Sequence, residues 1–305
     1  MNPFFTDYSE YIKRFFPETK IQKISVNTGN TCPNRDGTLG KGGCIYCDNR
    51  SFTPSYCFSS ESVVSQIEKG KAFFGRKYKD MKYLAYFQSY TTTYINGNSP
   101  VAGNLADIFH EVLECEDVVG LVIGTRPDCI GDDTIDLIRP FNNKYPIFVE
   151  LGIESMHDDT LRLINRGHDS KTSENTIARL RDNGFHVGAH IIAGLPGETE
   201  EMMLDTVSRL CYLGVESIKL HHLQILKNTT LHKMWERKEI KIQECSLESY
   251  LDFCIKVISR VPRSVAIERF LASSPPELVV APKWGIKNYE FTNLLLKRLK
   301  NNVSK

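Results

Sequence analysis

The sequence has 305 residues, of which 41% are hydrophobic and 25% are charged, and its formal net charge is +1. This composition is typical of a globular protein with a buried core and excludes a disordered chain, and so small a net charge gives no general attraction to polyanions. No run of residues approaches the roughly 20 apolar positions that a membrane span requires, and no export signal is visible. We therefore expect a cytoplasmic protein with no membrane partner.

Short apolar runs alternate with longer amphipathic segments along the first 220 residues. The runs predict strands at 21–26, 83–88, 118–123, 146–153, 186–193 and 215–220. The segments between them predict helices at 60–74, 102–113, 132–138, 158–164, 173–183 and 198–213. Nearly continuous apolar strands joined by helices indicate a parallel sheet covered by helices.

Residues able to do chemistry follow all six of these strands. A barrel gathers the loops at the C-terminal ends of its strands into one site, whereas an open sheet concentrates its site at one switch point. We therefore predict an α/β fold, a partial (β/α)6 TIM-type barrel of parallel strands. Residues 1–225 would form this barrel.

The alternation weakens beyond residue 225. The remaining segments predict helices at 230–238 and 247–259, one more strand at 265–270 and a basic amphipathic helix at 289–299. We interpret residues 226–305 as a C-terminal extension that faces the substrate.

Nine cysteines, an odd number without an export signal, favour a reducing compartment over a disulfide framework. Only Cys32, Cys44 and Cys47 lie close together, in the loop 31–47 after the first predicted strand, with the spacing C-x11-C-x2-C. Thiolates are soft ligands that suit zinc or an iron–sulfur cluster. An iron–sulfur cubane with three cysteine ligands leaves one iron open to an external molecule, whereas structural zinc needs a fourth ligand, for which Cys57 is the candidate.

The cysteine loop resembles that of the radical S-adenosylmethionine (radical SAM) enzymes, which also carry an aromatic residue, here Tyr46, just before the last cysteine. The eleven-residue first spacing is typical of their Elp3-like branch, which includes the proteins YhcC and YtqA. The segments that resemble its signatures are 31–47, 87–93, 123–128, 150–168 and 190–199. The resemblance implies a [4Fe-4S] cluster on Cys32, Cys44 and Cys47 that reductively cleaves S-adenosylmethionine to a 5′-deoxyadenosyl radical.

The resemblance also implies residues that bind S-adenosylmethionine beside Tyr46. Gln88 and Ser89 stand where the superfamily presents backbone oxygens to the methionyl amine. Glu154 would face the cofactor, and the fork-shaped guanidinium of Arg166 suits its carboxylate. His190 and Gly194 follow the fifth strand, where a missing side chain leaves room for adenine. Helix capping by Arg166 and a core position for His190 are the alternatives, and the residues that do the chemistry on the substrate are not identified.

For the substrate, the same branch suggests tRNA, whose wobble carboxymethylaminomethyluridine would lose its carboxymethyl part to leave aminomethyluridine. Tyr90 and Tyr94 could stack on a splayed base. Phosphate contacts could come from two basic clusters, which are Lys69, Lys71, Arg76, Lys77, Lys79 and Lys82, and then Lys297, Arg298, Lys300 and Lys305. A flavodoxin or ferredoxin would supply the electron. The alternatives are a radical SAM enzyme acting on a small molecule or protein side chain, and a non-catalytic, zinc-stabilised module that binds nucleic acid.

Overall fold

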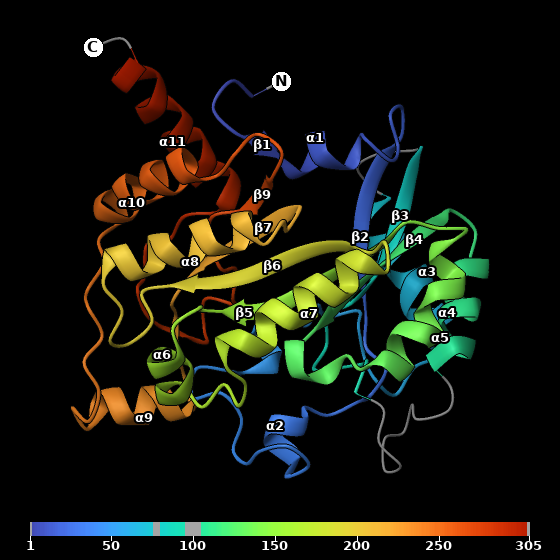
Figure 1. The fold of residues 1–305 in the computed structure, drawn as a ribbon, viewed down its shortest axis with the longest axis horizontal. Coiled ribbons are helices and arrows are strands. Elements are labelled where there is room, and N and C mark those ends of the chain that lie inside the picture. The colour runs from blue at the N-terminus through green and yellow to red at the C-terminus, as the bar shows by residue number, and fades with distance from the viewer. Residues whose placement is uncertain (1, 76–79, 95–104, 304–305) are drawn as a thin grey trace.

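The computed structural model describes residues 2–75, 80–94 and 105–303, and in these residues its central element is a sheet of eight strands. The strands follow the order β1-β9-β7-β6-β5-β4-β3-β2, and all neighbours are parallel (Figure 1). Their bounds are β1 Thr6–Asp7, β2 Lys20–Val26, β3 Met81–Phe87, β4 Val118–Thr125, β5 Ile147–Glu154, β6 His186–Ala193, β7 Ser217–His222 and β9 Ala266–Arg269.

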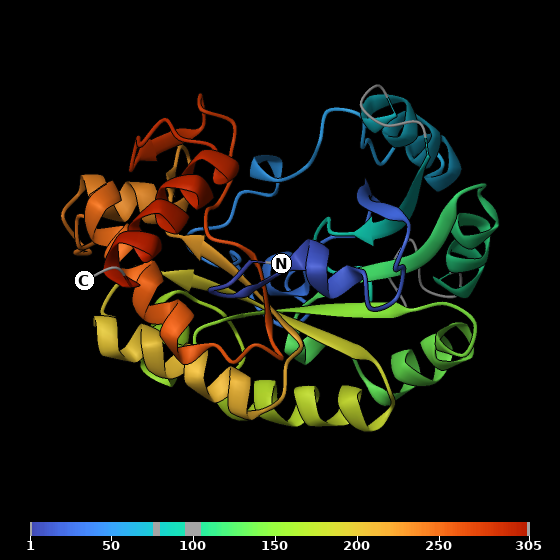
Figure 2. The same ribbon diagram turned by 90° about the horizontal axis from the view of Figure 1, so that it is seen from above.

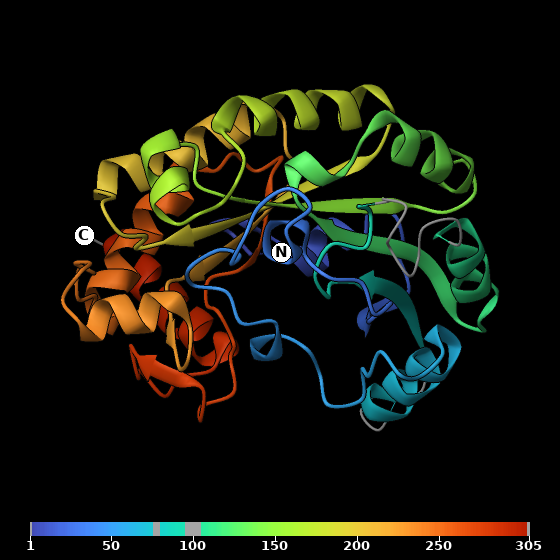
Figure 3. The ribbon, with the colours of Figure 1, turned by 90° about the horizontal axis from the view of Figure 1, so that it is seen from below.

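The sheet curls into a half-barrel with helices on its convex side, as Figures 2 and 3 show from opposite directions. The helices that follow β2 to β6 and cover this side are α3 Val63–Phe74, α4 Leu105–Glu114, α5 Asp132–Asn142, α7 Ser170–Asp182 and α8 Glu200–Tyr212. The short α6, Asp158–Leu163, precedes α7. Each helix buries its apolar stripe against strands that are themselves almost entirely buried, such as β5 with its first five residues buried.

The predicted fold class is confirmed, because the sheet is parallel, curled and covered by helices. All six predicted strands are present, and the seventh run, at 265–270, is β9. Strand β9 pairs with β7 and β1, so the residues beyond 225 contribute a strand to the barrel sheet itself. The division at residue 225 stays a prediction.

The N-terminal segment, for which the sequence predicted no element, forms β1 and the helix α1, Tyr8–Ile12. Asp7 caps this helix by accepting a hydrogen bond from the Glu10 N–H, and Tyr11 and Ile12 are buried. They pack against side chains from the inner face of the sheet, among them Tyr86 and Phe148. Figure 2 shows α1 inside the curve of the sheet, where it fills part of the barrel interior.

The C-terminal residues build a second layer beside the cysteine loop. It consists of α9 Thr230–Glu236, α10 Leu247–Arg260, α11 Asn288–Val303 and a two-stranded antiparallel sheet of β8 Ile225–Leu226 and β10 Val279–Ala281. The Leu231 N–H donates to the Ile45 carbonyl over 2.8 Å, and both side chains belong to one apolar cluster with Ile164 and Leu195. The cysteine loop is therefore anchored by the C-terminal layer. Within the described ranges, no helix is both long enough and apolar enough to span a membrane.

Candidate active site

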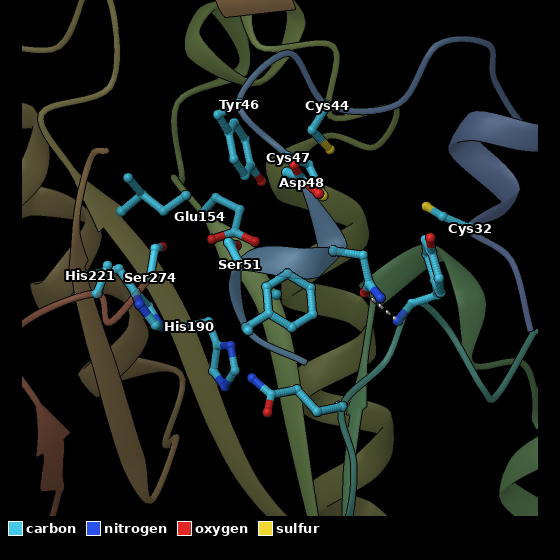
Figure 4. Close-up of a pocket in the computed structure, with 18 of the residues that line it drawn as sticks. Cys32, Cys44, Tyr46, Cys47, Asp48, Ser51, Glu154, His190, His221 and Ser274 are labelled. Carbon is cyan, nitrogen blue, oxygen red and sulfur yellow. Dashed lines mark hydrogen bonds between the residues drawn. The ribbon is translucent and has the colours of Figure 1, made fainter. Parts of the chain in front are cut away.

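A pocket lies at the C-terminal ends of the strands. Its walls come from residues at or after the ends of β2, β3, β4, β5, β6, β7 and β9. Cys32, Cys44 and Cys47 all line it, at one side of the view in Figure 4, and His190, His221 and Ser274 lie at the other. This arrangement is the one expected when a barrel gathers its chemistry at one end.

The three cysteines share this pocket without forming a preformed metal site. Cys44 and Cys47 lie near each other, whereas Cys32 lies apart from them (Figure 4). Among the described residues, no group of three His, Cys, Asp or Glu side chains is close enough to hold a metal ion. Cys32 precedes the short α2, Pro33–Asp36, whose following Gly37 has a φ of 98°, a left-handed value that glycine favours.

The surroundings of the thiols suit thiolate ligands. Arg166 Nη1 lies 3.4 Å from Cys44 Sγ, and Asn34 Nδ2 lies 3.7 Å from it, so both can donate to the sulfur. Burial and the neighbouring Cys44 raise the pKa of the Cys47 thiol to about 12. Cluster binding must therefore displace a proton from Cys47, and the residues present fit a cluster held by three thiolates.

Cys57 does not join the other three. It is 1% exposed, it does not line the pocket, and its Sγ lies 3.2 Å from Gln66 Oε1, to which it donates. Gln66 in turn bridges the backbone of Asn27, accepting from its N–H and donating to its carbonyl. Through Gln66, the buried Cys57 thus helps to fix the backbone at Asn27, just before the cysteine loop. Cys57 does not line the pocket with the other three cysteines, so in this structure it is not placed as the fourth thiolate of the zinc alternative.

Arg166 joins the cysteine loop to the end of β5. Its guanidinium donates to the Gly152 carbonyl and lies 3.7 Å from Glu154 Oε1, while its buried Nε has no partner. A Cβ on Gly152 would lie 2.7 Å from Arg166 Nη2, so a side chain there would force the guanidinium to move away from the strand. The register between β5 and β6 shifts between Gly152 and Glu154, and Glu154 has a φ of 71°. This bulge turns Glu154 into the pocket (Figure 4).

Two further residues hold this region in place. Asn165 Nδ2 donates to the carbonyls of Lys41 and Gly43, which ties the cysteine loop to the turn after α6. Arg126 forms a bidentate pair with Asp128 and donates to the Arg166 carbonyl over 2.7 Å. Because it is only 3% exposed, Arg126 positions Arg166 through its backbone.

A buried charge network fills the barrel beneath the pocket. Glu150 Oε2 lies 2.7 Å from both Tyr86 OH and His190 Nε2 and 2.9 Å from Lys219 Nζ. Lys219 also lies 3.0 Å from Glu268, and Lys23 contacts both glutamates. Burial alone would raise the pKa of Glu150, but Lys219 and Lys23 hold it well below its usual value. The network thus contains two ammonium and two carboxylate groups that balance each other.

The structure brings five of the seven expected S-adenosylmethionine residues to the pocket, and they are Tyr46, Gln88, Glu154, Arg166 and His190. Ser89 is buried and does not line the pocket. Gly194 also lies outside the lining, but a Cβ there would be 3.8 Å from Leu223, which does line the pocket. Burial, and then Lys219, lowers the pKa of His190.

Several residues that line the pocket were not predicted from the sequence, namely Phe52, Glu150, His221, Arg269 and Ser274. A signal for two of them was present, because Glu150 and Arg269 are charged residues inside otherwise apolar runs that predict strands. A charge in a buried strand requires a partner or a ligand. The other three lie in loops or at a strand end, where a polar or aromatic residue is ordinary.

His222 makes the C-terminal wall of the pocket sensitive to pH. Its ring stacks on Trp284, and its Nδ1 accepts a hydrogen bond from the Ala272 N–H over 3.2 Å, which requires the neutral form. Burial lowers the pKa of His222 from 6.5 to about 4. His222 therefore takes up a proton near pH 6.5 in the unfolded chain but only near pH 4 in the folded protein. The free energy of unfolding falls as the pH falls from 6.5 to 4.

We expect His222 to cost the apoprotein about 2 kcal/mol of unfolding free energy between pH 7 and pH 5. His222→Gln, which can still accept a hydrogen bond but does not titrate, should remove that part of the loss. Urea unfolding of both proteins at the two pH values measures the difference. Equal losses in both proteins would show that His222 does not titrate in this way.

The Radical SAM superfamily model matches residues 26–210, and the Radical_SAM C-terminal domain model matches residues 215–301. YtqA of Bacillus subtilis is 35% identical over 285 residues, which is 93% of this chain and 86% of that protein. A tRNA uridine(34) acetyltransferase of Methanocaldococcus jannaschii is 24% identical over 227 residues, which is 73% of this chain and 40% of that protein.

Among solved structures, Elp3 of Methanocaldococcus infernus with an N-terminal deletion superimposes with a TM-score of 0.65 at 18% identity. The match covers 94% of this chain and 64% of that one. At this identity the likeness concerns the fold.

Proposed function

Because this chain belongs to the radical SAM superfamily, in its Elp3-like branch, we propose that it modifies the wobble uridine of tRNA, converting carboxymethylaminomethyluridine to aminomethyluridine. The chain is a radical SAM enzyme whose cofactors are a [4Fe-4S] cluster and S-adenosylmethionine. When bound, these cofactors supply hydrogen-atom abstraction. Cys32, Cys44 and Cys47 would hold the cluster, and a flavodoxin or ferredoxin would supply the electron.

The observation that carries the tRNA proposal is the relationship to the tRNA uridine(34) acetyltransferase over 73% of this chain. The pocket supports it with two aromatic side chains from different loops, Phe52 and Tyr90, which can stack on a splayed base. The Tyr90 N–H donates to Asn49 Oδ1, which fixes the backbone at this ring. Tyr94, the other predicted stacking residue, lies outside the pocket lining.

The two basic clusters give this proposal less support than the sequence suggested. Lys69, Lys71 and Lys82 each form an ion pair with a nearby carboxylate, and Arg298 pairs with Glu248 and Asp252. Arg76, Lys77, Lys79 and Lys305 lie outside the described residues. Phosphate binding by the paired side chains would have to compete with these contacts.

The chain's own residues would bind and orient S-adenosylmethionine. Arg166 is the candidate for its carboxylate, because its buried Nε has no partner and its other nitrogens lie between Cys44 and Glu154. Glu154, turned inward by the bulge, is an acceptor for hydroxyl or amine groups. The half-buried wall formed by His190 and Ile192 would help to keep water from the reacting carbon.

We expect Arg166→Gln to weaken S-adenosylmethionine binding about 10- to 100-fold, since a charge-assisted pair is lost. Equilibrium dialysis against the reconstituted enzyme measures the affinity, and iron content shows whether the cluster is retained. Arg162→Gln, an exposed neighbour paired only with Asp159, is the matched control and should bind normally. An unchanged affinity in Arg166→Gln with full iron content would remove Arg166 from the site.

The test of the whole proposal is anaerobic reconstitution with dithionite and S-adenosylmethionine. The enzyme is incubated with tRNA that carries carboxymethylaminomethyluridine, and with unmodified tRNA. We expect 5′-deoxyadenosine together with aminomethyluridine only in the first case. Formation of 5′-deoxyadenosine without any change in either tRNA would point instead to a small molecule or a protein side chain as the substrate.

A further inference from the structure

The charged side chains of the pocket are paired, with one exception. Besides the histidines, those that line it are Arg35, Asp48, Arg126, Glu150, Glu154, Arg166 and Arg269. The first six all have a hydrogen-bond or ion-pair partner within the protein. Within the part of the chain that the structure describes, the Arg269 guanidinium has neither. An unpaired guanidinium in a half-buried wall is a site for an anion from outside the protein.

The nearby carboxylates do not fully neutralise Arg269, because each of them already contacts two lysines. Arg269 helps to lower the pKa of Glu268, as Lys219 and Lys23 do, but it forms no ion pair with that carboxylate in the described residues. Glu268, the preceding residue on β9, lies 2.8 Å from Lys23 and 3.0 Å from Lys219, and Glu150 contacts the same two lysines. Two ammonium groups balance two carboxylates, so the charge of Arg269 remains as an excess positive charge in this part of the pocket.

His221 is a second polar group available at the same place. It lies at the end of β7, the neighbour of β9, and lines the pocket without a hydrogen bond to any described residue. Its ring centre is 5.6 Å from that of His190. Burial, and then His190 and Arg269, lowers the pKa of His221 well below 6.5, so the ring is neutral at pH 7 and can donate one N–H.

Arg269 lies on the side of the pocket that β7 and β9 form. Strand β9 pairs with β7, which carries His221 near its end. In Figure 4, His221 lies at one side of the pocket and Cys32 at the other, with Glu154 and His190 between them. We call the part of the pocket at β7 and β9 the Arg269 side, and the part at the three cysteines the cysteine side.

We propose that Arg269, with His221 beside it, binds a carboxylate of the substrate and so determines substrate specificity. This inference rests on the proposed function, in which that carboxylate is the carboxymethyl group on the wobble uridine. A guanidinium presents two parallel N–H donors that match a carboxylate, and a buried environment strengthens the contact. The target group would then be held at one wall while the cysteine side holds the cofactors.

The experiment compares two anticodon stem–loops of one sequence, one with carboxymethylaminomethyluridine and the other with aminomethyluridine at the wobble position. Their affinities for the anaerobic, reconstituted, unreduced enzyme are measured by fluorescence anisotropy, so that no turnover occurs. We expect the wild-type enzyme to bind the carboxylate-bearing stem–loop at least about tenfold more tightly. Arg269→Gln should bind both equally, and Arg269→Lys should keep part of the preference.

The control is Arg260→Gln, an exposed arginine of α10, which should keep the full preference. Retained preference in Arg269→Gln, or no preference in the wild-type enzyme, overturns the proposal. Weakened S-adenosylmethionine binding with the preference intact also overturns it, because the guanidinium would then serve the cofactor.

If the wild-type enzyme binds neither stem–loop, the proposed tRNA function fails and a second measurement decides the role of Arg269. N-methylglycine carries the same carboxylate without the nucleoside, and methylamine lacks it. A rise in melting temperature with N-methylglycine alone, absent from Arg269→Gln, would support the carboxylate site for another substrate. No difference between the two compounds would overturn it.

Discussion

Replacing Cys32, Cys44 or Cys47 with alanine should abolish formation of 5′-deoxyadenosine, lowering its rate by at least about a thousandfold. Each cysteine lines the pocket. Because the fourth iron of the cluster has no protein ligand, removing one cysteine leaves only two thiolates to hold the cluster, which is too few. The measurements are iron and sulfide content, the visible absorption of the reconstituted protein, and 5′-deoxyadenosine after reduction with dithionite. A variant that keeps both its iron and its activity would show that the altered cysteine is not a ligand.

Cys57→Ser and Cys245→Ser are the matched controls. Serine at position 57 can still donate to Gln66, and Cys245 is exposed, so both variants should keep their iron. Loss of the cluster in Cys57→Ser with normal thermal stability would place Cys57 among the ligands. Stoichiometric zinc and a colourless protein after anaerobic reconstitution would support the zinc alternative.

Most of the fold could be predicted because the central strands of the sheet are buried on both faces. Strands β3, β4 and β5 are mostly apolar and mostly buried, and the parallel order follows once helices separate the apolar runs. The elements that were not predicted are too short to show a period. Strand β1 has two residues and α1 has five, so tertiary packing of Tyr11 and Ile12 determines their structure.

The candidate site was predictable only where its residues follow a local motif. The cysteine spacing with Tyr46 is such a motif, and these residues do meet in one pocket. The Glu154 side chain points into the pocket because of a bulge in the pairing of β5 with β6, and no sequence pattern predicts this bulge. The partners of Arg166 are similarly distant, because Cys44 is 122 residues earlier in the chain.

The charge network shows the same limit more strongly. Lys23, Glu150, Lys219 and Glu268 come from four strands, and Lys23 and Glu268 are 245 residues apart. Each residue alone appears as an isolated charge in a strand. Only the curvature of the sheet brings the four together, and Glu268 reaches them because β9 pairs with β7. Strand β9 also carries Arg269, which lines the pocket. The charge network and the proposed substrate site therefore both depend on the pairing of β9 with β7.

Glu150→Gln should therefore be strongly destabilising, lowering the unfolding free energy of the apoprotein by about 3–5 kcal/mol. The carboxylate is 3% exposed and accepts from Lys23, Lys219 and Tyr86, so its loss leaves two buried ammonium groups with one carboxylate between them. Urea unfolding followed by circular dichroism measures the effect. A loss below about 1 kcal/mol would mean that the buried charges are not held by Glu150.

Two further variants test whether the lost charge of Glu150, rather than the altered side chain as such, causes the destabilisation. Glu248→Gln removes a carboxylate from the exposed pair with Arg298 and should cost less than about 1 kcal/mol. Lys219→Met combined with Glu150→Gln restores the balance of one ammonium and one carboxylate, and should recover a large part of the lost stability.

Because Lys219 and Lys23 hold the pKa of Glu150 well below 4.5, the contribution of Glu150 to stability is fully present above that pH. It is lost as the pH falls through the lower folded value, so the difference between wild-type protein and Glu150→Gln should shrink only in strong acid.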